Sequence, residues 1–216
     1  MSCVAVIDYG GSNLRSVAKA IEFVARGAHQ VIITDDARAI LAADRVVFPG
    51  QGAIGECMSR LNALDLVPVL RQCIETRPFL GICLGLQSLM AFSDENGGTP
   101  CLSIYPGRVQ RFRDDAGPAP DGTPRKIPHM GWNEVHWTKS HPLAAGIPSG
   151  TRFYFVHSYY VVPREAHVVM GRTRYIEDFV SALADGYVFA TQFHPEKSAT
   201  AGLKLLENFL RWNGPG

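Results

Sequence analysis

Hydrophobic positions in the first half of the chain alternate between short runs rich in β-branched residues and segments with helical spacing. The short runs at residues 4–7, 31–33, 45–48 and 79–82 predict strands. Apolar positions at residues 14–24 share one face of a helix, for which Ser12 is the expected cap. Because strands that alternate with helices usually pair in parallel, this half predicts a parallel sheet flanked by helices.

The second half has a different pattern, in which apolar runs follow one another through short turns. These runs lie at residues 152–156, 167–170, 179–183 and 187–191, and a helix at residues 199–212 closes the chain. Successive strands of this kind favour an antiparallel extension of the sheet. The pattern therefore predicts an α/β fold in a single domain over residues 1–216, with a central, mostly parallel mixed sheet, flanking helices and an antiparallel extension.

Composition and charge exclude several function classes. The 216 residues are 46% hydrophobic and 19% charged, with a net charge of +1, so nothing favours nucleic acid or an anionic membrane. No segment has the length of a bilayer-spanning helix or the features of an export signal, and we expect a soluble, cytoplasmic protein. The five cysteines form no close pairs, so neither disulfides nor a metal site nor a cofactor is expected.

The most informative cysteine is Cys83, in the sequence GICLG. A nucleophile between two glycines, after a strand and before a helix, is typical of an elbow that holds the side chain above the carboxyl edge of the sheet. The apolar run at residues 88–92 is compatible with a helix that starts just after Cys83. On this motif alone, a buried structural cysteine is about as well supported as a nucleophile.

A base for that thiol is offered by the sequence HPE near the end of the chain. His194 and Glu196 are two residues apart, so an extended backbone places them on one side, and Pro195 favours that backbone for His194. A histidine oriented by a carboxylate is what a cysteine nucleophile requires. A surface turn is the alternative, and it loses support once Cys83 is considered.

A glycine-containing loop follows the third predicted strand. Gly50, Gln51 and Gly52 allow a backbone N–H to approach a substrate closely, and the N–H of Leu84 is the matching donor at the elbow. These groups are the predicted oxyanion hole. An ordinary turn between a strand and a helix explains the glycines about equally well.

Together, these three motifs resemble the triad-type (class I) glutamine amidotransferases, which carry a PGxG loop, a GxCxGxQ elbow and a late HPE in this order. The resemblance extends from the first strand to the last helix. Within the family, three further segments look like the glutaminase subunit of imidazole glycerol phosphate synthase: DYGGSNLRSV, KIPHMGWN and FVHSYY. Gln51 departs from the pattern, since a small apolar residue is frequent there.

The resemblance implies a catalytic triad of Cys83, His194 and Glu196 that hydrolyses glutamine through a thioester. It also implies that glutamine is bound by a second group of residues: Gln87, His157, Ser158 and Tyr159. The released ammonia would pass to a (β/α)8-barrel cyclase subunit, the heterodimer partner, in a step of histidine biosynthesis. The expected partner interface is formed by His129, Met130, Trp132, Asn133 and Tyr154.

Three other functions remain as alternatives. A glutaminase that serves another synthase is disfavoured by the PHMGWN and DYGGSNLRSV segments. A cysteine hydrolase of α/β-hydrolase type would have its acid before the histidine, whereas Glu196 follows His194. A silent scaffold would normally lack a triad residue, and all three residue types are present.

Overall fold

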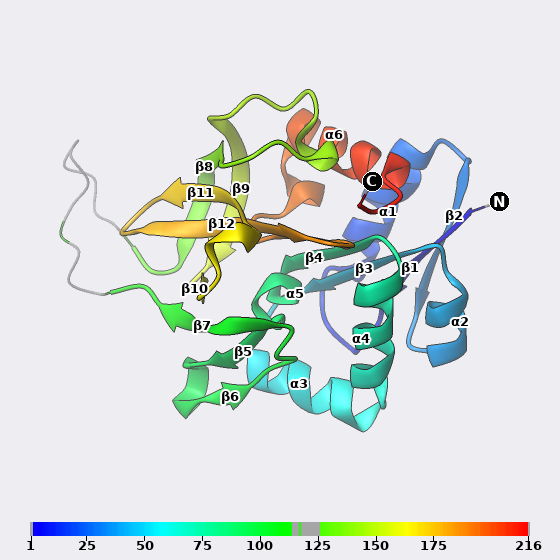
Figure 1. The fold of residues 1–216 in the computed structure, drawn as a ribbon, viewed down its shortest axis with the longest axis horizontal. Coiled ribbons are helices and arrows are strands. Elements are labelled where there is room, and N and C mark those ends of the chain that lie inside the picture. The colour runs from blue at the N-terminus through cyan, green and yellow to red at the C-terminus, as the bar shows by residue number, and fades with distance from the viewer. Residues whose placement is uncertain (1, 114–116, 118–125, 216) are drawn as a thin grey trace.

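A mixed sheet runs through the centre of the molecule, as Figure 1 shows for the computed structural model, which describes residues 2–113, 117 and 126–215. The main path of the sheet has the strand order β2-β1-β3-β4-β13-β12-β10-β7-β5-β6. The predicted fold class is confirmed. The Pro-, Gly- and Asp-rich sequence of residues 114–124 predicts a surface loop, to which we assign no role, and these residues lie outside the described part except for Gly117.

The parallel half of the sheet contains the strands expected from the first half of the chain and one strand from the end. These are β1 (Ser2–Ile7), β2 (His29–Thr34), β3 (Arg45–Gly50), β4 (Phe79–Cys83) and β13 (Val188–Thr191). Strand β13 runs parallel to β4 and antiparallel to β12, so the last described strand lies in the middle of the sheet.

Helices cover both faces of this half (Figure 1). They are α1 (Leu14–Ala25), α2 (Ala37–Ala42), α3 (Ile54–Ala63), α4 (Leu66–Thr76) and α6 (Ala199–Arg211). Alternate strand residues face opposite layers: Val4 and Val6 pack with α1 and α6, whereas Val46 and Phe48 pack with the other three helices. The inner strands β1, β3, β4 and β13 are therefore buried on both faces, which explains their nearly continuous apolar sequences, whereas the edge strand β2 is only partly covered.

The half of the sheet beyond β13 is antiparallel, except that β5 runs parallel to β7. Its strands are β12 (Asp178–Asp185), β10 (Tyr159–Pro163), β7 (Tyr105–Arg111), β5 (Met90–Ser93), β6 (Thr99–Pro100), β11 (Val169–Arg174), β8 (His129–Trp137) and β9 (Thr151–His157). Short 3-10 turns lie between them: η1 (Glu95–Gly97), η2 (Pro142–Ala144) and η3 (Ala166–Val168), and η4 (Pro195–Lys197) precedes α6. Strands β8, β9 and β11 form a branch that pairs with the main sheet through β12.

Two local predictions are wrong. Helix α1 is capped by Asn13, not Ser12, and without a side-chain hydrogen bond. The segment after the elbow is helical only in α5 (Leu84–Gln87), and residues 90–93 form strand β5. Backbone N–H groups of residues 101–105 bond the carbonyls of residues 88–91, and these pairings decide the conformation. A short apolar run does not distinguish a buried strand from a helix.

The end of α6 is fastened to the sheet by a buried arginine. The guanidinium of Arg45 on β3 donates to the carbonyl oxygens of Phe209 and Trp212 at 3.3 and 2.9 Å, and to Oδ1 of Asn213 at 2.7 Å. The last carbonyls of a helix lack a full set of partners within it, so Arg45 supplies the donor for Trp212 O and a second donor for Phe209 O, which also accepts the N–H of Trp212 at 3.3 Å.

Among the described residues, no helix has both the length and the apolar character needed to cross a membrane.

Candidate active site

Cys83 ends β4 and immediately precedes α5, in a strained conformation with φ 55° and ψ −101°. The two glycines of the elbow make this turn possible. A Cβ on Gly85 would collide with the carbonyl oxygen of Phe48, and one on Gly81 would lie 3.0 Å from the backbone of Gly85. With this ψ, Cys83 lies outside the left-handed helical region that other non-glycine residues at positive φ, such as Arg26 and Asp65, adopt, and strain of this kind is found at active sites. The sequence therefore forms the expected elbow.

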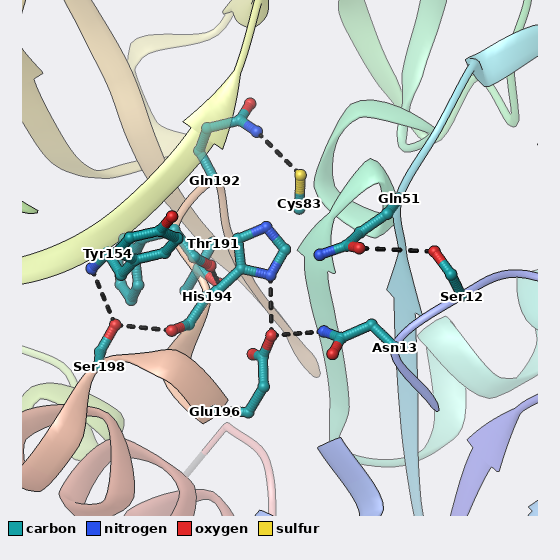
Figure 2. Close-up of polar contacts among 11 residues, drawn as sticks. Ser12, Asn13, Gln51, Cys83, Tyr154, Thr191, Gln192, His194, Glu196 and Ser198 are labelled. Carbon is teal, nitrogen blue, oxygen red and sulfur yellow. Dashed lines mark hydrogen bonds and ion pairs between the residues drawn. The ribbon is translucent and has the colours of Figure 1, made fainter. Parts of the chain in front are cut away.

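His194 presents its imidazole to Cys83 and to Glu196 on opposite sides, as Figure 2 shows. Its Nδ1 lies 2.8 Å from Oε1 of Glu196, and both side chains are almost completely buried. Because an ionised carboxylate only accepts, Nδ1 carries the proton of this contact. The Nε2 atom has no hydrogen-bond partner among the described residues, so it is the free ring nitrogen on the cysteine side.

The side chains of His194 and Glu196 each stabilise the charged form of the other. Burial opposes the charged form of His194, but the charges and polar contacts of Cys83 and Glu196 outweigh it and raise the pKa of His194. Burial likewise opposes the Glu196 carboxylate, yet the hydrogen bonds from His194 and Asn13 and the charge of His194 keep the pKa of Glu196 below its usual value. The arrangement favours an ionised Glu196 beside a readily protonated imidazole.

The turn that carries Glu196 differs from the expected extended segment. His194 is extended, with φ −102° and ψ 96°, but η4 follows it directly. The backbone N–H of His194 donates to Tyr154 O at 2.9 Å, and Ser198 Oγ donates to His194 O at 2.6 Å. Gly202 of α6 packs against this turn so closely that a Cβ there would collide with the carbonyl oxygen of Pro195. Strand β9 and helix α6 thus fix the turn from two sides.

The loop of residues 50–52 lies at the end of β3, beside the elbow. A Cβ on Gly50 would collide with the hydroxyl of Tyr9, and Gly52 has φ +103°, so both positions require glycine. Ser12 Oγ lies 3.4 Å from Oε1 of Gln51 and donates to it. The structure places this loop and Leu84 around Cys83, and their role as an oxyanion hole stays a prediction.

A cavity of about 350 Å³ opens above Cys83. It is lined by residues expected to hold the oxyanion and the substrate and by residues that the sequence did not single out: Gln51, Gly52, Cys83, Leu84, Gln87, Glu95, Tyr154, Val156, His157, Ser158, Tyr159 and Lys197. Its volume is in the range of small-molecule sites. Gln87 also has internal partners, since its Nε2 donates to Tyr159 O at 3.0 Å and to Gln192 Oε1 at 3.1 Å.

The five residues expected at a partner interface lie on two faces of the β8–β9 ribbon. Met130 and Trp132 are 62% and 44% exposed. The ring of Trp132 packs edge-on against that of half-buried Tyr154, with the ring centroids 6.2 Å apart. His129 is 3% exposed and lies beneath this surface, and Asn133 shares its face of β8. Successive strand residues point in opposite directions, so a contiguous motif cannot form one surface. His129 is therefore not part of the exposed face, which corrects the expected interface at that residue.

Two residues at the site were missed in the sequence. Asn13 Nδ2 donates to Glu196 Oε1 at 2.6 Å, and Gln192 Nε2 lies 3.5 Å from the sulfur of Cys83. Asn13 follows the first strand, and the carboxyl ends of parallel strands share one edge, so its position was available as a signal. For Gln192, the sequence offered one signal of a place at the site, which is its position two residues before His194. No group of three or more potential ligand side chains in the described ranges is arranged to hold a metal ion.

Comparison with known proteins identifies the family of the chain. The family model "Glutamine amidotransferase class-I" matches residues 5–212. "Imidazole glycerol phosphate synthase subunit HisH" of Nitrosococcus oceani is 59% identical over 99% of both chains, and that of Methylococcus capsulatus is 54% identical over 98% of this chain and 97% of its own.

Solved structures show the same fold at much lower identity. A glutamine amidotransferase from Thermotoga maritima has a TM-score of 0.62 and 17% identity, covering 93% of this chain and 78% of its own. The glutaminase domain of Trypanosoma brucei CTPS has a TM-score of 0.62 and 16% identity, and the match covers 98% of this chain and 94% of its own. With its HisH relatives matched from end to end, the chain belongs to the class-I glutamine amidotransferase family, together with these HisH subunits.

Proposed function

We propose that this chain hydrolyses glutamine with a triad of Cys83, His194 and Glu196 and passes the ammonia to the cyclase of imidazole glycerol phosphate synthase. The observation that carries the proposal is the 2.8 Å contact between His194 Nδ1 and Glu196, which leaves Nε2 as the free nitrogen toward Cys83. The imidazole of His194 then lies between the nucleophile and the acid that orients it, which is the order that a triad requires.

In the first half of the reaction the Cys83 sulfur attacks the side-chain amide carbon of glutamine. The proton of the thiol resides on His194 Nε2, and His194 donates it to the amide nitrogen as the C–N bond breaks. Ammonia leaves and a glutamyl thioester remains on Cys83. Glu196 holds the imidazole in one orientation and stabilises its positive charge, which agrees with the raised pKa of His194.

In the second half a water molecule gives a proton to His194 Nε2 and attacks the thioester carbon. The C–S bond breaks, glutamate leaves, and the sulfur is restored. Both halves pass through a tetrahedral oxyanion, for which we propose the N–H groups of Leu84 and of residues 50–52 as donors. One such donor contributes about 3 kcal/mol to the transition state in comparable sites.

The cavity suits glutamine in its lining. Polar groups of Gln87, Ser158 and Tyr159 line it, and we propose that the segment 157–159 binds the amino and carboxylate groups of the substrate. Ammonia released into water is protonated and loses its nucleophilicity, so direct delivery to a (β/α)8-barrel partner is part of the proposal. Met130 and Trp132 are exposed apolar side chains of β8, and Trp132 contacts Tyr154, which lines the cavity. This surface suits the contact with that partner.

Glutamine-dependent ammonia release tests the proposal. The chain is assayed alone, and then with the purified cyclase and its ribotide ligand, and we expect stimulation in the complex. Cys83→Ala should abolish release and the covalent glutamyl adduct seen by intact-mass measurement. Cys73→Ala, which removes a buried thiol in α4, is the matched control and should retain both.

The outcomes separate the parts of the proposal. Full stimulated activity of Cys83→Ala would refute the nucleophile. Glutamine hydrolysis that no cyclase stimulates would refute the partner while leaving the chemistry intact. Activity with the cyclase but without a glutamyl adduct in a rapidly quenched reaction would refute the thioester.

A further inference from the structure

Two histidines lie against each other inside the β8–β9 ribbon. His129 and His157 are register partners on neighbouring strands, and His129 Nδ1 lies 2.9 Å from His157 Nε2. Both side chains are buried, at 3% and 6% exposure. Neither belongs to the proposed triad, and a buried pair of ring nitrogens requires one donor and one acceptor.

A backbone carbonyl determines the direction of this hydrogen bond. His157 Nδ1 lies 2.7 Å from the carbonyl oxygen of Tyr159, and a carbonyl oxygen can only accept. His157 therefore carries its proton on Nδ1. In the neutral ring Nε2 is then an acceptor, so His129 must donate to it from Nδ1.

The other nitrogen of His129 confirms this direction. Asn133 Nδ2 lies 3.2 Å from His129 Nε2 and also donates to Arg174 O at 3.0 Å. The Oδ1 atom of Asn133 accepts the N–H of Glu134 at 2.8 Å, which fixes the orientation of the amide. Asn133 is therefore the donor and His129 Nε2 the acceptor, so both histidines have the Nδ1–H tautomer.

The environment keeps both rings neutral. Burial lowers the pKa of His129 to about 4, and burial together with the charge of His129 lowers that of His157 to about 3. His129 stacks on Tyr175 and Phe155 with ring centroids 4.0 and 4.8 Å away. The geometry of the hydrogen bonds and the burial thus agree on one protonation state.

From the carbonyl of Tyr159 the hydrogen bonds continue to the nucleophile. Gln87 Nε2 donates to Tyr159 O at 3.0 Å and to Gln192 Oε1 at 3.1 Å. Gln192 must then point its Nε2 at the Cys83 sulfur, 3.5 Å away. Tyr159 and Gln87 line the cavity above Cys83. An unbroken series of contacts runs from Asn133 to the floor of the site.

We propose that Asn133 and His129 are positioning residues for glutamine hydrolysis, which hold His157 and the carbonyl of Tyr159 in place and through them the amides of Gln87 and Gln192. The proposal rests on the function proposed above. Its consequence is that residues outside the cavity set the affinity for glutamine, because the segment 157–159 forms one wall of the cavity.

Nuclear magnetic resonance tests the protonation directly and without any turnover. Long-range 1H–15N spectra of the chain at pH 7 should show His129 and His157 protonated at Nδ1 and bare at Nε2. In His129→Leu the side-chain amide resonances of Gln87 and Gln192 should shift. The matched control His136→Leu, an exposed histidine of the same strand, should leave them unchanged. A proton on Nε2 of either histidine, or unshifted amides in His129→Leu, would overturn the proposal.

Kinetics of the complex with its cyclase test the positioning role. We expect His129→Leu and Asn133→Leu to raise KM for glutamine about tenfold while kcat changes less than about twofold, since the lost hydrogen bonds support the cavity wall of residues 157–159 and neither His194 nor Glu196 loses a contact. His129→Gln, whose amide offers a donor and an acceptor, should recover most of the loss. An unchanged KM, or a fall in kcat alone, would refute the role. If the wild-type complex released no ammonia from glutamine, the proposed function would fail, while the spectra would still decide the hydrogen-bond series.

Discussion

Removing the amide of Asn13 should slow the reaction without weakening substrate binding. Asn13 Nδ2 donates to Glu196 Oε1 at 2.6 Å, and Oε2 has no partner among the described residues, so Asn13 and His194 share the only bonded oxygen. Asn13 has φ 76°, which glycine adopts freely. Asn13→Gly therefore deletes the hydrogen bond while the backbone conformation remains accessible.

The size of the effect follows from the kind of bond that is lost. A hydrogen bond to a charged group contributes about 1.5–3 kcal/mol, and each 1.36 kcal/mol corresponds to about a tenfold change in rate. Since His194 still bonds the same oxygen, we expect kcat of the activated complex to fall about tenfold. KM for glutamine should not change, because Asn13 does not line the cavity.

Stability and pH should change in a defined direction. The hydrogen bond from Asn13 helps to lower the pKa of Glu196 in the folded protein, a contribution that is present above the unfolded pKa and lost as pH falls through the folded pKa. The stability difference between wild type and Asn13→Gly, measured by urea unfolding, should therefore shrink at acid pH. In Asn13→Asp a second carboxylate raises the pKa of Glu196. As the solution is acidified, the variant should therefore lose activity at a higher pH than wild type does.

A control separates this effect from the general loss of an asparagine. Asn62→Ala removes an amide that donates to Met58 O at 2.8 Å in α3, and it should keep normal kcat. If Asn13→Gly had wild-type kcat and wild-type stability at pH 7, the view that Asn13 holds Glu196 would be refuted.

Three further substitutions test the packing around the site. Gly85→Ala drives a Cβ into Phe48 O and should abolish ammonia release and lower the urea midpoint, whereas Gly55→Ala in α3, where a Cβ has room, should raise the midpoint. Gly202→Ala should lower kcat about tenfold or more by displacing the turn of Glu196, although alanine favours the helix; normal activity would contradict that close packing. Arg45→Met leaves the carbonyl of Trp212 without its donor and removes one of two donors from Phe209 O, and it should cost about 3 kcal/mol of unfolding free energy without changing KM; an unaltered urea midpoint would show that Trp212 O finds another partner.

Much of the fold and of the candidate site could be predicted because local rules specify them. The inner strands of the parallel half are buried on both faces and have apolar sequences, and the elbow requires glycine on steric grounds at Gly81 and Gly85. Pro195 restricts His194 to an extended backbone wherever the segment lies. These features depend on neighbours within a few residues of the chain.

The failures have a common cause in long-range pairing. Residues 90–93 are a strand because β6 and β7 lie beside them, which no local pattern reveals. Gln192 and Asn13 act through partners more than a hundred residues away. The split of the expected interface, in contrast, follows from strand alternation and could have been anticipated for His129.

The central place of β13 has a consequence for how the protein is made. Its neighbours β4 and β12 are synthesised first, and their facing edges stay unpaired until residues 188–191 leave the ribosome. An unpaired apolar strand edge invites association with other chains. Until β13 is made, the edges of β4 and β12 that it pairs are open to association with other chains, and the insertion of this strand also brings His194 to the side of Cys83. A chain interrupted before this strand would lack His194 and Glu196, so on the proposed mechanism it would not hydrolyse glutamine.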